Sequence, residues 1–178
     1  MITAIMVDGG FYRKRARHIF GKKSPAARAE ELHMYCCRHL KDKHEERTLY
    51  RIFYYDCPPS GKVVSHPITK ETIQLDRSPV YEWTNDFFQE LTKQRKMALR
   101  MGEVLESSVG YALRPDSLKK LLQKKITVDE LTDNDFSLDF KQKGVDMRIG
   151  LDIASLAHKG ASKNPKLKRT EALVQGGS

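Results

Sequence analysis

Hydrophobic and polar positions follow one another along the chain in blocks that predict strands and helices in turn. Residues 2–7 form a short, almost wholly apolar run, typical of a strand buried on both faces of a parallel sheet. Residues 8–10 (Asp-Gly-Gly) end this run. Ser24 and Pro25 then predict a helix start, with serine as N-cap and proline in the first turn. Apolar positions at three-and-four spacing continue this helix: Leu32, Tyr35, Cys36, His39 and Leu40.

A second strand and further elements are predicted in the remainder of the chain. Residues 49–55 are rich in aromatic and β-branched residues and end in Asp-Cys-Pro-Pro, which predicts a strand and a firm stop. Strand, helix and strand in this order indicate a right-handed βαβ unit and an α/β fold. The other segments are predicted as a loop over 61–79, a helix over 84–96, a strand entering a hairpin over 97–113, a helix over 116–125, a capping box at 127–130 and alternation over 136–140. A last helix is predicted over 145–158, with Ile149, Ile153 and Leu156 on one side.

Length and composition predict a globular protein of the cytoplasm. The 178 residues suffice for one domain, expected over residues 1–159, and residues 160–178 read as a basic flexible tail without a strand. No apolar run is long enough for a membrane span, and no signal peptide is evident. Three cysteines without CxxC spacing favour reduced thiols. The net charge of +9 favours a polyanionic partner, although a solvated surface explains it equally well.

Three aspartates are candidates for chemistry. Asp8 follows the first strand directly, and ligands of open α/β sheets gather at the carboxyl ends of the strands. The alternative is an ordinary Asp-Gly turn. Asp146 stands at a predicted helix N-terminus, where the helix dipole favours a carboxylate without any function. Asp152 lies mid-helix about 120° and about 9 Å from Asp146, so it either reaches the edge of the site or holds a neighbour in place.

Carboxylates without nearby His or Cys ligands favour a hard cation, Mg²⁺ or Mn²⁺, which can activate water and neutralise a phosphodiester. The six histidines show no metal-ligand spacing. A Ser-His-Asp order, a P-loop and a GxGxxG fingerprint are all absent from the sequence. These absences weigh against serine hydrolase, kinase-like and dinucleotide-binding functions.

Two segments together resemble the NYN domain, a group of PIN-like nucleases that includes the bacterial LabA-type proteins. They are residues 6–11 (MVDGGF) and residues 143–154 (KGVDMRIGLDIA), and Asp56 and residues 100–103 (RMGE) also match this group loosely. The resemblance covers residues 1–159. It implies a three-layer α/β/α fold with a mainly parallel sheet, and a metal-assisted RNA-cleaving site. Asp8 and Asp146 would hold the metal, with Asp152 as a third catalytic member.

The chain departs from this group in two places. Phe11 and Tyr12 occupy a stretch where many members have an asparagine. The resemblance also implies a strand after the last helix that ends in a Gly-Asp-x-Asp turn and supplies the remaining metal-binding acids. No such segment follows Lys159, after which Glu171 is the only acid. The expected consequence is an incomplete sheet in a truncated or frameshifted chain. The first strand would then keep an open apolar edge, which a second copy or a partner strand could complete.

Two functions therefore remain open. The first is a Mg²⁺- or Mn²⁺-dependent endoribonuclease, and the second is a catalytically incomplete remnant that binds RNA or a protein. A non-nuclease α/β protein whose acids only cap turns and helices is a third, weaker interpretation. The basic residues directly after Asp8 are the expected RNA contacts, namely Arg13, Lys14 and Arg15, with Phe11 and Tyr12 available for stacking on a base.

Overall fold

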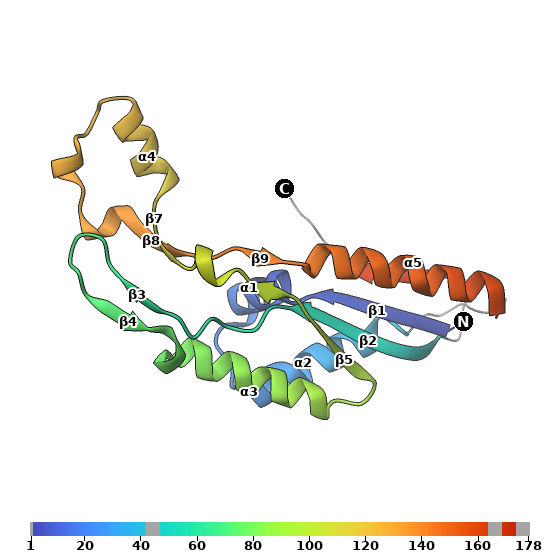
Figure 1. Cartoon of the computed structure of the whole chain (residues 1–178). Coiled ribbons are helices and arrows are strands. Elements are labelled where there is room, and N and C mark those ends of the chain that lie inside the picture. The colour runs from blue at the N-terminus through green and yellow to red at the C-terminus, as the bar shows by residue number, and fades with distance from the viewer. Residues whose placement is uncertain (1, 42–46, 164–168, 174–178) are drawn as a thin grey trace. The chain divides into compact units, whose positions relative to one another are not determined.

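A computed structural model describes residues 2–41, 47–163 and 169–173, and only the backbone for 159–163 and 169–173 (Figure 1). The helices are α1 (Gly9–Phe20), α2 (Pro25–Arg38), α3 (Pro79–Lys93), α4 (Pro115–Leu122) and α5 (Val145–Lys163). The strands are β1 (Ile2–Asp8), β2 (Thr48–Asp56), β3 (Val63–Ser65), β4 (Thr72–Gln74), β5 (Met97–Met101), β6 (Glu103–Val104), β7 (Gly110–Leu113), β8 (Phe136–Asp139), β9 (Gln142–Lys143) and β10 (Arg169–Leu173). Short 3-10 turns lie at Leu75–Arg77, Glu106–Ser108, Val128–Glu130 and Asp133–Asp135.

The chain divides into two compact units. The sheet unit comprises Met1–Pro58, Trp83–Glu103 and Lys143–Ser178, and the inserted unit comprises Pro59–Glu82 and Val104–Gln142. The inserted unit contains two antiparallel pairs, β3 with β4 and β7 with β8. This division was not predicted from the sequence, because segments that return to the same unit are separated by long stretches of chain.

The sheet unit is built on a parallel sheet with strand order β10-β1-β2-β5. The predicted strands over 2–7 and 49–55 are confirmed as β1 and β2, and they pair in parallel as a βαβ unit requires. The helix predicted from Ser24 is also confirmed, since the Ser24 side chain accepts a hydrogen bond from the amide of Ala27 at 3.3 Å. The chain is therefore a mixed α/β protein.

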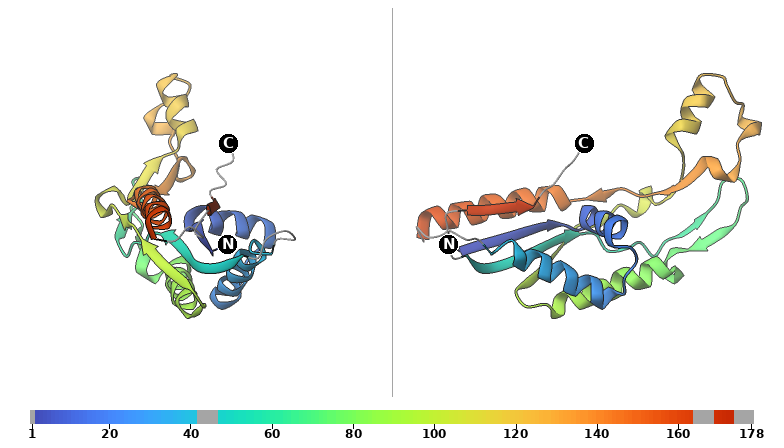
Figure 2. Two further views of the ribbon diagram at one scale, coloured as in Figure 1. Left: turned by 90° about the vertical axis from the view of Figure 1, so that its right-hand side faces the viewer. Right: turned by 180° about the vertical axis from the view of Figure 1, so that it is seen from behind.

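Helices pack on both faces of this sheet (Figure 2). Side chains alternate along β1 and β2, so that Ile5 and Tyr54 belong to one core cluster and Met6 and Tyr55 to the other. The first cluster joins the sheet to α2 and α3, and the second joins it to α5. The apolar stripe predicted for the last helix is confirmed, because Ile149, Ile153 and Leu156 all face the second cluster.

The prediction of no strand after Lys159 was wrong. Helix α5 continues to Lys163, and β10 pairs in parallel with β1, with Ile5 opposite Glu171. The edge of β1 predicted to be open is therefore covered by this chain. The segment is small and charged, but ladder hydrogen bonds come from the backbone, so an apolar sequence is not required for pairing. The remainder of the predicted tail, residues 164–168 and 174–178, lies outside the described residues.

Three further segments differ from their predictions. Residues 9–20 form α1, a helix that the sequence did not predict. Its two glycines disfavour a helix, and its many charged residues leave too few apolar positions to mark a buried side. Residues 61–79, predicted as a loop, contain β3 and β4. The hairpin predicted over 97–113 does not form, since β5 pairs with β2 and β7 pairs with β8. The alternation of apolar and polar residues predicts that a segment is a strand, but it does not identify the strand with which that segment pairs. Among the described residues, no helix has the length and apolar character of a membrane span.

Candidate functional site

The carboxyl end of the parallel sheet is the place where its topology favours a ligand. The chain runs from β1 to β2 to β5 on one side, and α5 then carries it over the opposite face to β10 on the other side of β1. The strand order therefore reverses between β1 and β10. Ligands of open α/β sheets bind outside the carboxyl ends of the strands at such a reversal. Asp8 is the last residue of β1 and stands at this point.

Asp8 is half-buried and caps α1. Its Oδ1 accepts a hydrogen bond from the amide of Phe11 at 3.0 Å, so the Asp-Gly pair begins a helix and does not form a free turn. Its Oδ2 has no hydrogen-bond partner among the residues that the structure describes. One carboxylate oxygen thus fixes the helix start, and the other takes no part in this cap.

Gly9 allows α1 to begin in contact with the end of β2. A Cβ at this position would lie 2.5 Å from Cζ of Tyr54 and 2.6 Å from Oδ2 of Asp56. Because Tyr54 and Asp56 are fully buried, neither can move aside easily. The close approach places the first turn of α1 directly over the Asp56 carboxylate.

Asp56, the last residue of β2, is a buried carboxylate. Its Oδ1 accepts hydrogen bonds from Arg13 Nη2 at 3.0 Å and the amide of Cys57 at 2.8 Å, and its Oδ2 accepts one from the Tyr54 hydroxyl at 3.1 Å. Burial raises the pKa of Asp56, against the lowering effect of Arg13 and these hydrogen bonds. Burial and the neighbouring Asp56 also raise the pKa of Tyr54. With its oxygens occupied, Asp56 fixes the helix and is not free to bind a ligand.

Asp146 lies in the first turn of α5, and its side chain is exposed. The start of α5 is close to the carboxyl end of β5, because a Cβ on Gly102 would lie 2.6 Å from the carbonyl oxygen of Lys143 and 2.9 Å from Val145. Figure 1 shows α5 beginning at the end of the sheet where β1 finishes. Asp8 and Asp146 therefore belong to the same edge. The described part of the chain nevertheless contains no group of three or more His, Cys, Asp or Glu side chains placed to hold a metal ion.

Asp152 lies further along α5 and is held by two neighbours. Its Oδ2 accepts hydrogen bonds from the Tyr55 hydroxyl at 2.8 Å and from Arg100 Nε at 3.0 Å. The Arg100 guanidinium also lies 5.2 Å from the centre of the Phe53 ring. These contacts join α5 to β2 and β5, which is the arrangement expected of a residue that holds its neighbours in place.

The three predicted RNA contacts on α1 differ in their surroundings. Arg13 points inward, where its Nη1 donates to Thr84 Oγ1 at 3.3 Å and its guanidinium lies 5.9 Å from the centre of the Phe88 ring, in addition to its bond with Asp56. Lys14 and Arg15 are exposed. The structure thus engages Arg13 inside the fold and leaves the other two on the surface.

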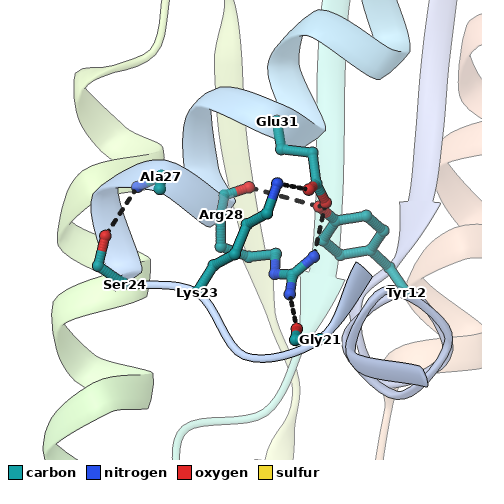
Figure 3. Close-up of polar contacts among 7 residues, drawn as sticks. All are labelled: Tyr12, Gly21, Lys23, Ser24, Ala27, Arg28 and Glu31. Atoms are coloured by element: carbon teal, nitrogen blue, oxygen red, sulfur yellow. Dashed lines mark hydrogen bonds and ion pairs between the residues drawn. The ribbon is translucent and has the colours of Figure 1, made fainter. Parts of the chain in front are cut away.

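A partly buried polar cluster centred on Arg28 joins α1 to α2 (Figure 3). Arg28 is 3% exposed, and its guanidinium donates to Glu31 at 2.6 Å and to the carbonyl oxygen of Gly21 at 2.5 Å. Lys23 and the Tyr12 hydroxyl also donate to Glu31, at 2.6 Å and 3.1 Å. Partial burial alone would raise the pKa of Glu31, but these three donors outweigh it and lower the pKa. Tyr12 is therefore committed to this cluster and is not available for stacking on a base.

Two arginine–carboxylate pairs, each with one buried partner, were not predicted from the sequence: Arg13 with Asp56 and Arg28 with Glu31. A hydrophobic pattern treats each of these charges as a surface residue. For Arg28 there was one available signal, its position three residues before Glu31 on the helix side that also carries Leu32.

Comparison with known proteins gives no assignment: no family model, no curated protein and no solved structure matches this chain.

Proposed function

We propose that this chain is an RNA-processing domain of the PIN-like NYN type, which binds RNA at the carboxyl edge of its sheet and hydrolyses a phosphodiester there with the help of a divalent cation. The observation that carries the proposal is the position of Asp8 at the strand-order reversal between β1 and β10. The resemblance of residues 6–11 and 143–154 to that group adds support, since the first segment crosses this edge from β1 into α1 and the second begins there and continues into α5.

The distribution of charge supports a polyanionic ligand for the sheet unit. The sheet unit holds 23 Lys and Arg against 13 Asp and Glu, a net charge of +10, whereas the inserted unit holds nine against ten, a net charge of −1. The basic excess therefore belongs entirely to the unit that carries Asp8 and Asp146. If the charges served only to keep the surface solvated, the positive excess would not need to lie in one unit. A concentration of positive charge in the sheet unit would, however, favour the binding of phosphate groups there.

The donor set at the edge fits a hard cation that keeps much of its own water. Neither Asp8 Oδ2 nor the Asp146 carboxylate has a hydrogen-bond or ion-pair partner among the described side chains. Two carboxylates are enough for Mg²⁺ or Mn²⁺ when waters and substrate phosphates complete the coordination. When bound, such a cation neutralises charge on the phosphodiester and activates water for hydrolysis.

The chain's own residues position the RNA. The first turns of α1 and α5 both lie at this edge, and the positive ends of helix dipoles favour phosphate groups. Gly9 and the Arg13–Asp56 pair fix the direction of α1, and Asp152 fixes α5 through Tyr55 and Arg100. We therefore assign Asp152 a positioning role.

A second candidate function is RNA binding without cleavage. The observation in its favour is that the described residues contain no group of three acids able to hold a metal ion. In this case RNA binds the same edge but is not cleaved. Its length then stays the same whether a metal is added or a carboxylate is removed.

Cleavage of end-labelled single-stranded RNA by the purified chain, in Mn²⁺ or in EDTA, tests the proposal. Asp8→Asn is the key variant because asparagine is an equally good N-cap, so α1 keeps its start while the ionised carboxylate is lost. Asp146→Asn is compared with Asp116→Asn, which removes an acid from the first turn of α4 in the inserted unit.

We expect metal-dependent cleavage that falls at least about tenfold in Asp8→Asn and Asp146→Asn and is unchanged in Asp116→Asn. Cleavage that persists in EDTA, or that survives in both site variants, would contradict it. Intact RNA that binds a folded chain in both conditions would establish the second candidate function instead.

A further inference from the structure

The outward face of α1 carries one aromatic side chain followed by cationic and imidazole side chains at helical spacing. The members of this α1 stripe are Phe11, Lys14, Arg15 and His18, which are three, four and seven positions apart and are all exposed. Tyr12 and Ala16 point to the other side, toward α2 and the core. Over seven residues the stripe extends about 10 Å along the helix. It begins one turn from Asp8, whose carboxylate holds the amide of Phe11.

The cations of the α1 stripe have no acidic partner among the residues that the structure describes. Helix α1 contains no Asp or Glu, and neither Lys14 nor Arg15 forms an ion pair with any residue that the structure describes. Nearby cations behave differently, since Arg13 pairs with Asp56 and Lys23 with Glu31. Within the described part of the chain, no acid therefore competes with an external anion for this charge.

We infer that the α1 stripe binds single-stranded RNA, with Phe11 stacked on an unpaired base beside the site and Lys14 and Arg15 bound to phosphates further along the strand. This inference rests on the proposed function, because it takes RNA at the sheet edge as its starting point. It revises the contacts expected from the sequence, since Arg13 and Tyr12 are used inside the fold.

The mixture of one aromatic ring with cations favours a single strand over a duplex. In a duplex the faces of the bases are already stacked on one another, so only unpaired bases can stack on a protein ring. Cations contribute in either case, because both forms carry phosphates. Phe11 is 40% exposed and stands at the end of the stripe nearest Asp8. The first base of the bound strand is thus fixed close to the carboxylates.

Binding measured in EDTA separates this inference from the proposed hydrolysis. The probe is a fluorescein-labelled single-stranded RNA of about 12 nucleotides, within the range of known single-strand sites, and fluorescence anisotropy is recorded over a series of salt concentrations. Phe11→Leu keeps an apolar side chain but removes the ring, and Phe11→Trp keeps a ring. Lys14→Gln with Arg15→Gln removes two charges, and Lys119→Gln with Lys120→Gln removes two exposed charges from α4 as the matched control.

The expected result is binding about 5- to 150-fold weaker in Phe11→Leu and near the original in Phe11→Trp. The salt dependence, plotted as log K against log salt, should become shallower by about 1.4 in the Lys14 and Arg15 double variant, at about 0.7 per lost phosphate contact, and should not change in the α4 control. Competition by the duplex form should be weaker than by the single strand.

Normal binding by both the Phe11→Leu variant and the double variant would overturn the inference, and the proposed function would then stand with RNA bound elsewhere on the edge. An equal loss of affinity in the α4 control would overturn it too. The total positive charge of the chain would then explain the binding, whatever the position of the cations. Loss of anionic-vesicle binding in the same variants with unchanged RNA binding would assign the stripe to a membrane surface instead. If the unmodified chain bound no RNA, both the inference and the proposed function would fail.

Discussion

Gly9 and Gly10 are adjacent glycines at the start of α1, and alanine should have opposite effects at the two positions. At Gly9 the new Cβ would lie 2.5–2.6 Å from ring atoms of Tyr54 and from Asp56 Oδ2, about 1 Å closer than ordinary contact. Tyr54 is fully buried, with its ring against Phe87 and its hydroxyl on Asp56. Overpacking of this kind costs about 1–3 kcal/mol.

At Gly10 the same methyl group would meet only Oδ1 of Asp8 at 3.5 Å, an ordinary contact. The backbone φ of Gly10 is not in the positive region, so alanine fits without strain. Replacing glycine with alanine in a helix stabilises the folded state by about 0.5–1 kcal/mol. Gly10→Ala is thus the matched control for Gly9→Ala.

Urea unfolding followed by far-UV circular dichroism and by Trp83 fluorescence measures both effects. Trp83 is the single tryptophan, and it donates to the carbonyl oxygen of Lys23 at 2.9 Å and stacks on Phe87, so it reports on the packing of α3 near α1 and α2. With m of about 2 kcal/mol/M, the midpoint should fall by about 0.5–1.5 M in Gly9→Ala and rise by about 0.25–0.5 M in Gly10→Ala. A Gly9→Ala protein as stable as the original, or equal losses in both variants, would refute the close packing of α1 on the end of β2.

Three further results are expected. Arg28→Met should lower the free energy of unfolding by about 1–3 kcal/mol, because it leaves Glu31 partly buried with two donors in place of three; unchanged stability in chemical denaturation would contradict this. The lowered pKa of Glu31 means that its stabilising effect is present above about pH 4.5 and is lost as the pH falls through its folded-state value. Glu31→Gln should therefore flatten the acid side of a stability-against-pH curve, and an unchanged acid limb would show that Glu31 is not the group involved. Asp152→Asn should slow RNA cleavage less than Asp146→Asn does, since Asp152 is held by Tyr55; equal rate losses in a single-turnover assay would give it a direct role.

Much of the sheet unit followed from residue patterns. The apolar run over residues 2–7 predicted β1, Ser24 and Pro25 predicted the start of α2, and the spacing of Ile149, Ile153 and Leu156 predicted the buried side of α5. In each case burial on a regular element imposes a period on the sequence. The position of Asp8 at the carboxyl end of β1 followed for the same reason.

Other features depend on contacts that leave no local period. Helix α1 buries few apolar side chains and is fixed by the Asp8 cap, by Gly9 and by Arg13 bonded to Asp56, and these partners lie far apart in the sequence. The strand β10 pairs through its backbone with β1, so its composition gave no signal. The two-unit division depends likewise on which distant segments meet. Spacing alone could not determine that Arg13 turns inward while Lys14 and Arg15 stay exposed.

Photo-crosslinking with single-stranded RNA that contains 4-thiouridine tests the location of the site most directly. The reaction is carried out in EDTA on the full chain, and crosslinked peptides are identified by mass spectrometry. We expect crosslinks within residues 8–18 and 143–148, at the starts of α1 and α5. Crosslinks confined to residues 104–142 of the inserted unit would contradict it, because RNA would then bind away from the carboxyl edge of the sheet.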